Sequence, residues 1–187
     1  ETLDRFAEIM NMRQKAFDDA RAKNAPVGMK LYNCLQVVDL LTAMAGNPCV
    51  TTRVLPKTNC DMYAYSAYQT SIPEYNYAQS IETLKNYAPA SKLLGKNNLY
   101  IGEMGIPEME FGTDRVYTNL LKGYKTLINN DMLYGVMWQI YCNEPKDRND
   151  VSLINSHDND DYRGFWLIRA DGTKTPIYHV LKMALKN

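Results

Sequence analysis

Several features that would point to a function class are missing from this 187-residue chain. Lysine plus arginine and aspartate plus glutamate each number 21, so no excess charge favours nucleic acid or an anionic membrane as a partner. No apolar run approaches the roughly 20 residues that a membrane-spanning helix needs. The four cysteines have neither the density of a disulfide-stapled scaffold nor the spacing of a CxxC metal site. We therefore expect free, mostly buried thiols. The length of the chain is that of one domain, spanning residues 1–187.

The chain does contain a regular alternation of apolar strands and helices. Strands are predicted over 29–38, 61–70, 97–105 and 133–141, with starts near 30, 62, 99 and 133 at spacings of 32, 37 and 34 residues. Helices are predicted over 1–26, 40–46, around 77–87 and over 113–130, and from Pro176 onward, with Thr175 as the last N-cap. Ser71 and Glu74 are spaced as a capping box just ahead of the helix around 77–87. Residues 50–60 are predicted as a loop and 164–168 as a short extended segment. Continuous apolar strands that alternate with helices are typical of a parallel α/β sheet.

The repeat length favours a (β/α)₈ barrel, of which four units would supply half. A doubly wound open sheet has a similar spacing of strands and helices along the chain. However, no glycine-rich phosphate loop follows any of the predicted strands, which weakens the nucleotide-binding version of that fold.

Candidate functional residues collect where the predicted strands end, which is where a βα barrel builds its site. Glu103 follows an apolar run and stands between two glycines, where an unpaired charge would be costly unless it meets a cation or does chemistry. Tyr68 and Trp138 end other strands by the same interpretation, and Asn143 and Glu144 lie just beyond the fourth. A carboxylate beside an aromatic platform is the combination that a glycosidase needs.

Each candidate also has a purely structural interpretation. Glu103 would then pair with a lysine or arginine of a neighbouring strand, and Tyr68 and Trp138 would pack in the core. Asn143 and Glu144 would be solvated loop residues. These alternatives stay open at the level of the sequence.

Other polar or aromatic positions are not predicted to carry the chemistry. Tyr63 and Tyr65 share a strand with Tyr68 and are predicted to lie in the core or barrel wall. Arg13 falls on the apolar stripe of the first helix, formed by Leu3, Phe6, Ile9, Met10, Phe17 and Ala20, and is expected to make a buried hydrogen bond or ion pair. The oxygen-rich segment "NSHDNDDY" (155–162) lacks the glycine that an EF-hand loop needs, so it is predicted to be a mobile, hydrated active-site loop and not a metal site. Neither His157 in this loop nor His179 in the last helix is assigned a specific role.

Four segments, in order, resemble the retaining glycoside hydrolases of clan A. "LYIGEMG" is similar to their seventh strand and "LYGVMWQIYCNE" to their eighth. "DMYAYSAYQTS" looks like the sixth strand, and "GFWLIRADGTKTPIYHVLK" like the closing turn and last helix. The resemblance implies a (β/α)₈ TIM-barrel fold in which this chain supplies strands five to eight and their helices.

The resemblance also implies roles for the site residues. Glu103 would be the catalytic nucleophile, Tyr68 its hydrogen-bonding partner and Trp138 the floor of the sugar subsite. Asn143 or Glu144 would contact substrate hydroxyls, and Ser66 is grouped with these substrate-binding residues. No cofactor is implied.

The general acid/base of the family is a glutamate at the end of the fourth strand, which the resemblance would put before residue 1. A retaining mechanism needs both carboxyl groups. The expected partners are therefore an oligosaccharide or polysaccharide substrate and either the amino-terminal half-barrel or a second copy, joined through open sheet edges. Secretion is the favoured location, because related polysaccharide-degrading enzymes are commonly exported.

Two rival functions remain. One is an inactive barrel fragment that binds carbohydrate without hydrolysing it. The other is a barrel aldolase or an amidohydrolase relative, whose chemistry depends on a Schiff-base lysine or on clustered histidines and aspartates that this chain does not offer at its strand ends.

Overall fold

The computed structural model describes residues 2–28, 30–67, 76–104, 112–129, 135–137, 139–141, 166–168 and 172–184. The chain divides into two compact units. Unit 1 comprises Glu1–Ser66, Asn76–Gly102 and Asn130–Gly135, and unit 2 comprises Ala67–Tyr75, Glu103–Asn129 and Val136–Asn187. Among the described residues, no helix combines the length and apolar character needed to cross a bilayer.

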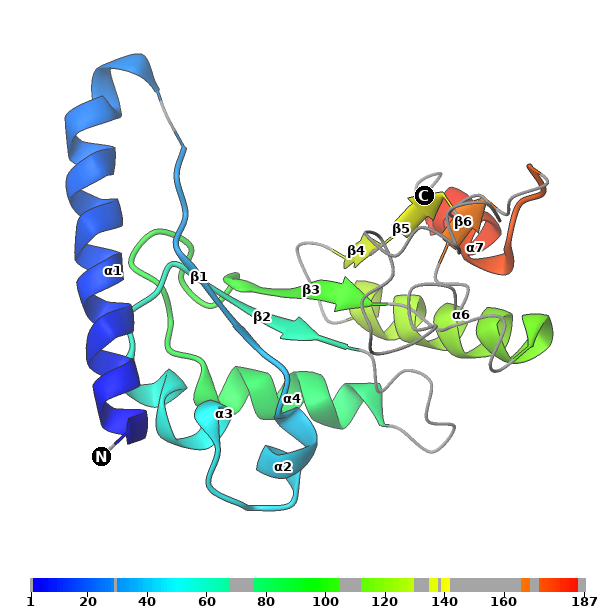
Figure 1. Ribbon diagram of the computed structural model, residues 1–187, viewed down its shortest axis with the longest axis horizontal. Coiled ribbons are helices and arrows are strands. Elements are labelled where there is room, and N and C mark those ends of the chain that lie inside the picture. The colour runs from blue at the N-terminus through cyan, green and yellow to red at the C-terminus, as the bar shows by residue number, and fades with distance from the viewer. Residues whose placement is uncertain are drawn as a thin grey trace, which may run out of the picture. The chain divides into compact units, whose positions relative to one another are not determined.

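Unit 1 alternates helices with parallel strands (Figure 1). Its elements are α1 Thr2–Asn24, the 3-10 turn Ala25–Val27, β1 Cys34–Val37, α2 Leu40–Met44, α3 Val50–Arg53, the 3-10 turn Leu55–Lys57, β2 Met62–Ser66, α4 Tyr77–Tyr87 and most of β3 Leu99–Met104. In Figure 1, α2, α3 and α4 lie on one side of the three strands, and α1 runs beside β1.

The strands of the main sheet follow the order β1-β2-β3-β4, which is also their order in the sequence. β1 and β2 are parallel and in register from Cys34 opposite Met62 to Val37 opposite Tyr65. β3 follows β2 through α4, as a βαβ connection requires. This parallel arrangement agrees with the expectation of βα units, while the complete barrel stays a prediction.

The core of unit 1 lies between the strands and the helices. Tyr63 and Tyr65 in β2 are 0% and 1% exposed, as the sequence predicts for core tyrosines. The phenol of Tyr63 lies 2.9 Å from the hydroxyl of Thr58, which satisfies the polar end of a buried ring. The largest other fully buried side chains are Leu40, Val54, Leu55, Ile81, Leu84 and Ile101.

The first helix ends close to its predicted limit, with Pro26 in the turn that follows it. Its buried side differs from the predicted stripe, because Ile9 is 46% exposed while Gln14 is 3% exposed. Arg13 does make the expected hydrogen bond, donating 2.6 Å to the carbonyl of Cys34. The helix therefore faces the strands with a polar side as well as an apolar one.

The helix predicted over 77–87 matches α4, which spans Tyr77–Tyr87. The capping box predicted at Ser71 and Glu74 is wrong, because the N-cap is Asn76, whose side chain accepts a hydrogen bond of 3.1 Å from the N–H of Gln79. The loop predicted over 50–60 is wrong, because this stretch contains α3 and a 3-10 turn. The side chain of Asp39 accepts from the N–H of Val50 at 2.7 Å, and a four-residue helix is too short to show a periodic pattern.

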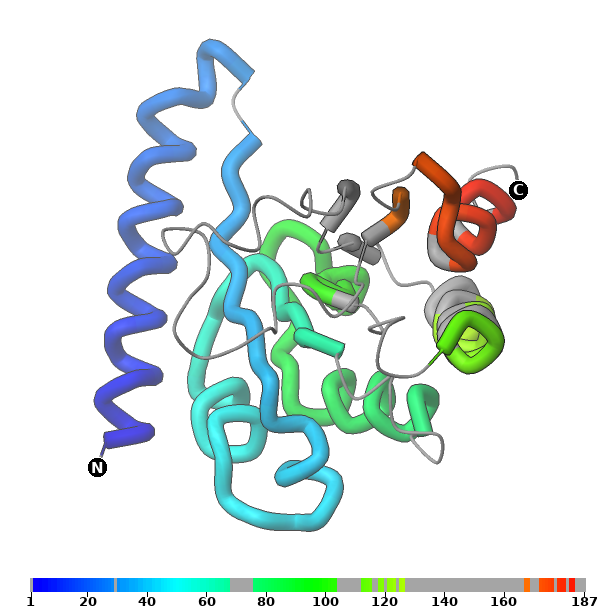
Figure 2. The backbone as a smooth tube through the Cα atoms, turned by 45° about the vertical axis from the view of Figure 1, so that its right-hand side comes forward, coloured from blue at the N-terminus to red at the C-terminus, as the bar shows by residue number. Residues whose placement is uncertain are grey.

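Unit 2 contains the end of β3, α6 Thr113–Asn129, the last two residues of β4 Gly135–Met137, β5 Gln139–Tyr141, β6 Trp166–Ile168 and α7 Pro176–Ala184. Figure 2 shows α7 beside α6. α7 begins at Pro176 as predicted, and the hydroxyl of Thr175 donates 3.0 Å to the carbonyl of Leu167. The strand predicted over 133–141 is two strands: β4 belongs to the main sheet, and β5 pairs in parallel with β6.

Candidate functional site

Glu103 is the fifth residue of β3, and its side chain is half-buried. Its carbonyl accepts a hydrogen bond of 2.7 Å from the N–H of Ala67, the residue after β2. At the start of this pairing, the N–H of Tyr63 donates 2.8 Å to the carbonyl of Asn98, the residue before β3. Between these two bonds the chain advances by four residues along β2, from Tyr63 to Ala67, and by five along β3, from Asn98 to Glu103. β3 thus contains one extra residue, which is the definition of a β-bulge.

The bulge matters for Glu103 because of the alternation of side chains along a strand. Regular alternation would put Glu103 on the same face as Ile101, which is 1% exposed. The extra residue interrupts this alternation, so Glu103 need not lie on the same face as Ile101. Bulges are over-represented beside active sites, where they re-aim a side chain.

Ser66 is the last residue of β2 and is 3% exposed. Its hydroxyl accepts a hydrogen bond of 2.5 Å from the side-chain amide of Gln36 in β1. A Cβ on Gly102 would overlap the amide oxygen of Gln36 and lie 3.3 Å from the Cβ of Ala64. These four residues of unit 1 therefore share one face of the sheet.

Gln36 is not among the site residues that the sequence predicts. The signal that marks it is a carboxamide inside the apolar run "CLQVV", where a parallel strand buried on both faces should be apolar throughout. Four other predicted site residues, Tyr68, Trp138, Asn143 and Glu144, lie outside the described residues, as do 155–162.

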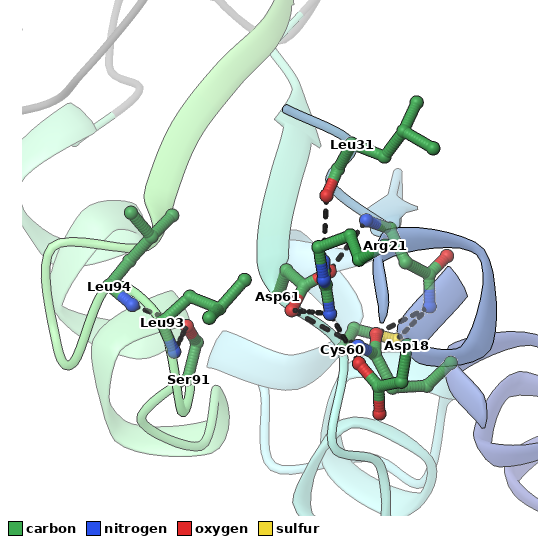
Figure 3. Close-up of polar contacts among 10 residues, drawn as sticks. Asp18, Arg21, Leu31, Cys60, Asp61, Ser91, Leu93 and Leu94 are labelled. Atoms are coloured by element: carbon green, nitrogen blue, oxygen red, sulfur yellow. Dashed lines mark hydrogen bonds and ion pairs between the residues drawn. The ribbon is translucent and has the colours of Figure 1, made fainter. Parts of the chain in front are cut away.

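A second polar cluster lies at the opposite, amino ends of β1 and β2 (Figure 3). Asp61, 2% exposed, directly precedes β2 and accepts hydrogen bonds of 2.7 and 3.2 Å from the guanidinium of Arg21. The amide of Gln14 donates to Asp61 at 3.0 Å and the N–H of Asn33 at 2.8 Å. Arg21 also binds the carboxylate of Asp18 and the carbonyl of Leu31. The cluster ties α1 to the sheet.

The electrostatics of this cluster favour an ionised Asp61. Burial raises the pKa of the carboxyl group, but hydrogen bonds from Arg21, Asn33 and Gln14 outweigh burial and hold the pKa below its usual value. The sequence signal was an aspartate directly before an apolar strand together with Gln14 and Arg21 on the first helix. In a βα fold, polar groups at the amino ends of the strands serve stability.

Two thiols adjoin the Asp61 cluster. The phenol of Tyr100 donates 3.0 Å to the sulfur of Cys34, and the side-chain amide of Asn33 donates 3.5 Å to the sulfur of Cys60. Burial raises the pKa of both thiols, which keeps them protonated and poorly nucleophilic. The three cysteines of the described part of the chain are free, as predicted. Within that part, no three histidine, cysteine or acidic side chains are grouped closely enough to hold a metal ion.

Comparison of the chain with family models, with curated proteins and with solved structures gave no match.

Proposed function

We propose that this chain is the carboxyl-terminal half of a (β/α)₈ domain that hydrolyses β-linked glycans with retention, with Glu103 as the nucleophile. The observation that carries the proposal is the bulge that puts an extra residue into β3 next to Glu103. The parallel pairing of β1 and β2 and the βαβ connection through α4 support it as well. In such folds, chemistry occurs at the carboxyl ends of the strands, and Glu103 is the penultimate residue of β3.

In the proposed reaction, the carboxylate of Glu103 attacks the anomeric carbon while a second carboxyl group protonates the leaving oxygen. Water then hydrolyses the glycosyl ester, and the second group acts as the base. Tyr68 would orient Glu103, and Trp138 would support the sugar ring. Asn143, Glu144 and Ser66 would contact substrate hydroxyls.

The second carboxyl group is proposed to come from the preceding half of the barrel, at about 5–5.5 Å from Glu103. β1 ends the strand order of the main sheet, so among the described strands its outer edge faces no partner strand. Such an edge readily pairs with another strand. The preceding half-barrel is its proposed partner, with self-association expected in its absence.

The test uses the natural protein that carries this chain, a panel of aryl β-glycosides and β-linked oligosaccharides, and a 2-deoxy-2-fluoro glycoside with a good leaving group. The fluorosugar is expected to add its mass to the peptide that contains Glu103, because it slows hydrolysis of the glycosyl ester. Glu103→Gln should lower turnover at least about 1,000-fold, because it removes the nucleophile.

Glu82→Gln is the matched control, because Glu82 is an exposed glutamate on α4. It should leave turnover at the parent level. Undiminished turnover in Glu103→Gln, or a label on another residue, would remove Glu103 from the mechanism. Binding of sugars by the parent without hydrolysis would instead support the alternative of an inactive carbohydrate-binding barrel.

A further inference from the structure

Gln36 occupies an unusual position for an exposed polar side chain. It lies in the middle of β1, between Leu35 and Val37, which are 5% and 3% exposed. Its own side chain is exposed, on the opposite face of the strand. Parallel strands are usually apolar on both faces, so an exposed carboxamide here calls for an explanation beyond packing.

The side chain of Gln36 is held in place from two directions. Its amide nitrogen donates 2.5 Å to the hydroxyl of the buried Ser66, and its amide oxygen occupies the space that Gly102 leaves by having no side chain. The carboxamide is therefore both exposed and positioned. Restricting a polar group before a ligand arrives reduces the entropy lost on binding.

The surroundings of Gln36 indicate the kind of ligand. Seven described residues share its face: Cys34, Gln36, Met62, Ala64, Ser66, Tyr100 and Gly102, which we call the Gln36 face. None of these seven is charged at neutral pH. A carboxamide has two N–H donors and an accepting oxygen, so with one N–H on Ser66 it can still donate to one hydroxyl and accept from another.

We propose that Gln36 is a specificity-determining residue that binds neighbouring hydroxyl groups of an uncharged sugar. The inference rests on the proposed function and adds a residue and a ligand class: neutral oligosaccharides in preference to uronic-acid oligosaccharides. Gln36 lies in the carboxyl-terminal half of β1, and ligands of parallel α/β proteins bind at the carboxyl ends of the strands.

The experiment measures binding by titration calorimetry, with neutral β-linked oligosaccharides and a uronic-acid oligosaccharide as probes. Gln36→Ala and Gln36→Met should both weaken binding of the neutral sugar about tenfold, which corresponds to the loss of one or two hydrogen bonds. Gln36→Met keeps the length of the side chain, so it separates lost hydrogen bonding from lost packing. Gln79→Ala, which removes an exposed carboxamide on α4, should bind like the parent. Circular dichroism verifies that every variant is folded.

The outcomes separate this inference from the proposed function. Equal affinity of Gln36→Met and the parent for the neutral sugar overturns the role of Gln36. A fluorosugar label on Glu103 in the same protein would still support Glu103 as the nucleophile. A parent that prefers the uronic-acid probe overturns the ligand class. A parent that binds neither probe overturns the inference, and a missing label on Glu103 then overturns the proposed function with it.

Discussion

The N–H of Ala67 donates to the carbonyl of Glu103, one residue later along β3 than the bond from Tyr63 to Asn98 requires. The carboxyl end of the sheet is thus irregular where Glu103 lies. The amino ends of β1 and β2, in contrast, are fixed to α1 by the bonds from Arg21 and Gln14 to Asp61. This polarity fits a βα protein, in which the amino ends of the strands provide stability and the carboxyl ends carry the site.

Gly102→Ala tests the space that the Gln36 carboxamide uses. The new Cβ would displace the Gln36 amide and break its bond to Ser66, so we expect a loss of about 0.5–1.5 kcal/mol in the free energy of unfolding. In a Gln36→Ala background there is no amide to displace, and the same substitution should cost less. Urea unfolding of the four proteins in this double-mutant cycle measures the coupling. Equal costs in both backgrounds would show that Gln36 does not occupy that space.

Arg21→Met tests the clamp between α1 and the sheet. The substitution leaves the buried carboxylate of Asp61 without its cation, so we expect a loss of about 3–5 kcal/mol. Asp18→Asn is the control, because the side chain of Asp18 is 46% exposed and its ion pair with Arg21 should contribute less than about 1 kcal/mol. Urea unfolding measures both losses, and similar values for the two variants would contradict the assigned difference.

The lowered pKa of Asp61 predicts a stability change in acid. Because the pKa is lower in the folded chain, the unfolded chain binds the proton at a higher pH. The contribution of Asp61 is complete above its usual pKa near 4 and is lost as the pH falls through the lower folded value. Unfolding midpoints in urea from pH 7 to pH 2.5 should therefore fall less steeply in Asp61→Asn than in the parent. Parallel curves would assign the acid sensitivity to other carboxyl groups.

The long elements were predictable because their patterns extend over many residues. The residues of α4 agree with the prediction although its N-cap does not, and the limits of α1 and α6 agree to within two residues. The helix Val50–Arg53 was missed because four residues are shorter than two helical turns. The predicted strand over 133–141 also failed, since an apolar run does not reveal that its two halves pair in different sheets.

The candidate site was predictable only in part, for a related reason. Glu103 could be predicted as a candidate because its flanking glycines and the apolar run are local features of the sequence, and its role stays a prediction. Gln36 and Asp61 were missed because their roles depend on partners that are 30 and 40 residues away along the chain, Ser66 and Arg21. In the sequence, Gln36 is marked only as a polar residue inside an apolar strand, and Asp61 only as a polar residue directly before one.

The thiols of Cys34 and Cys60 give a last prediction, on chemical reactivity. Cys60 is 0% exposed and Cys34 is half-buried, and burial raises the pKa of both. Since the thiolate is the reactive form, iodoacetamide should modify each in the native chain at least about tenfold more slowly than in the chain unfolded by guanidinium. Ala22→Cys places a thiol at an exposed position of α1 and should react rapidly in the native state. Peptide mass spectrometry follows each site, and native labelling of Cys60 at the rate of the introduced thiol would mean that the amino end of β2 opens to solvent.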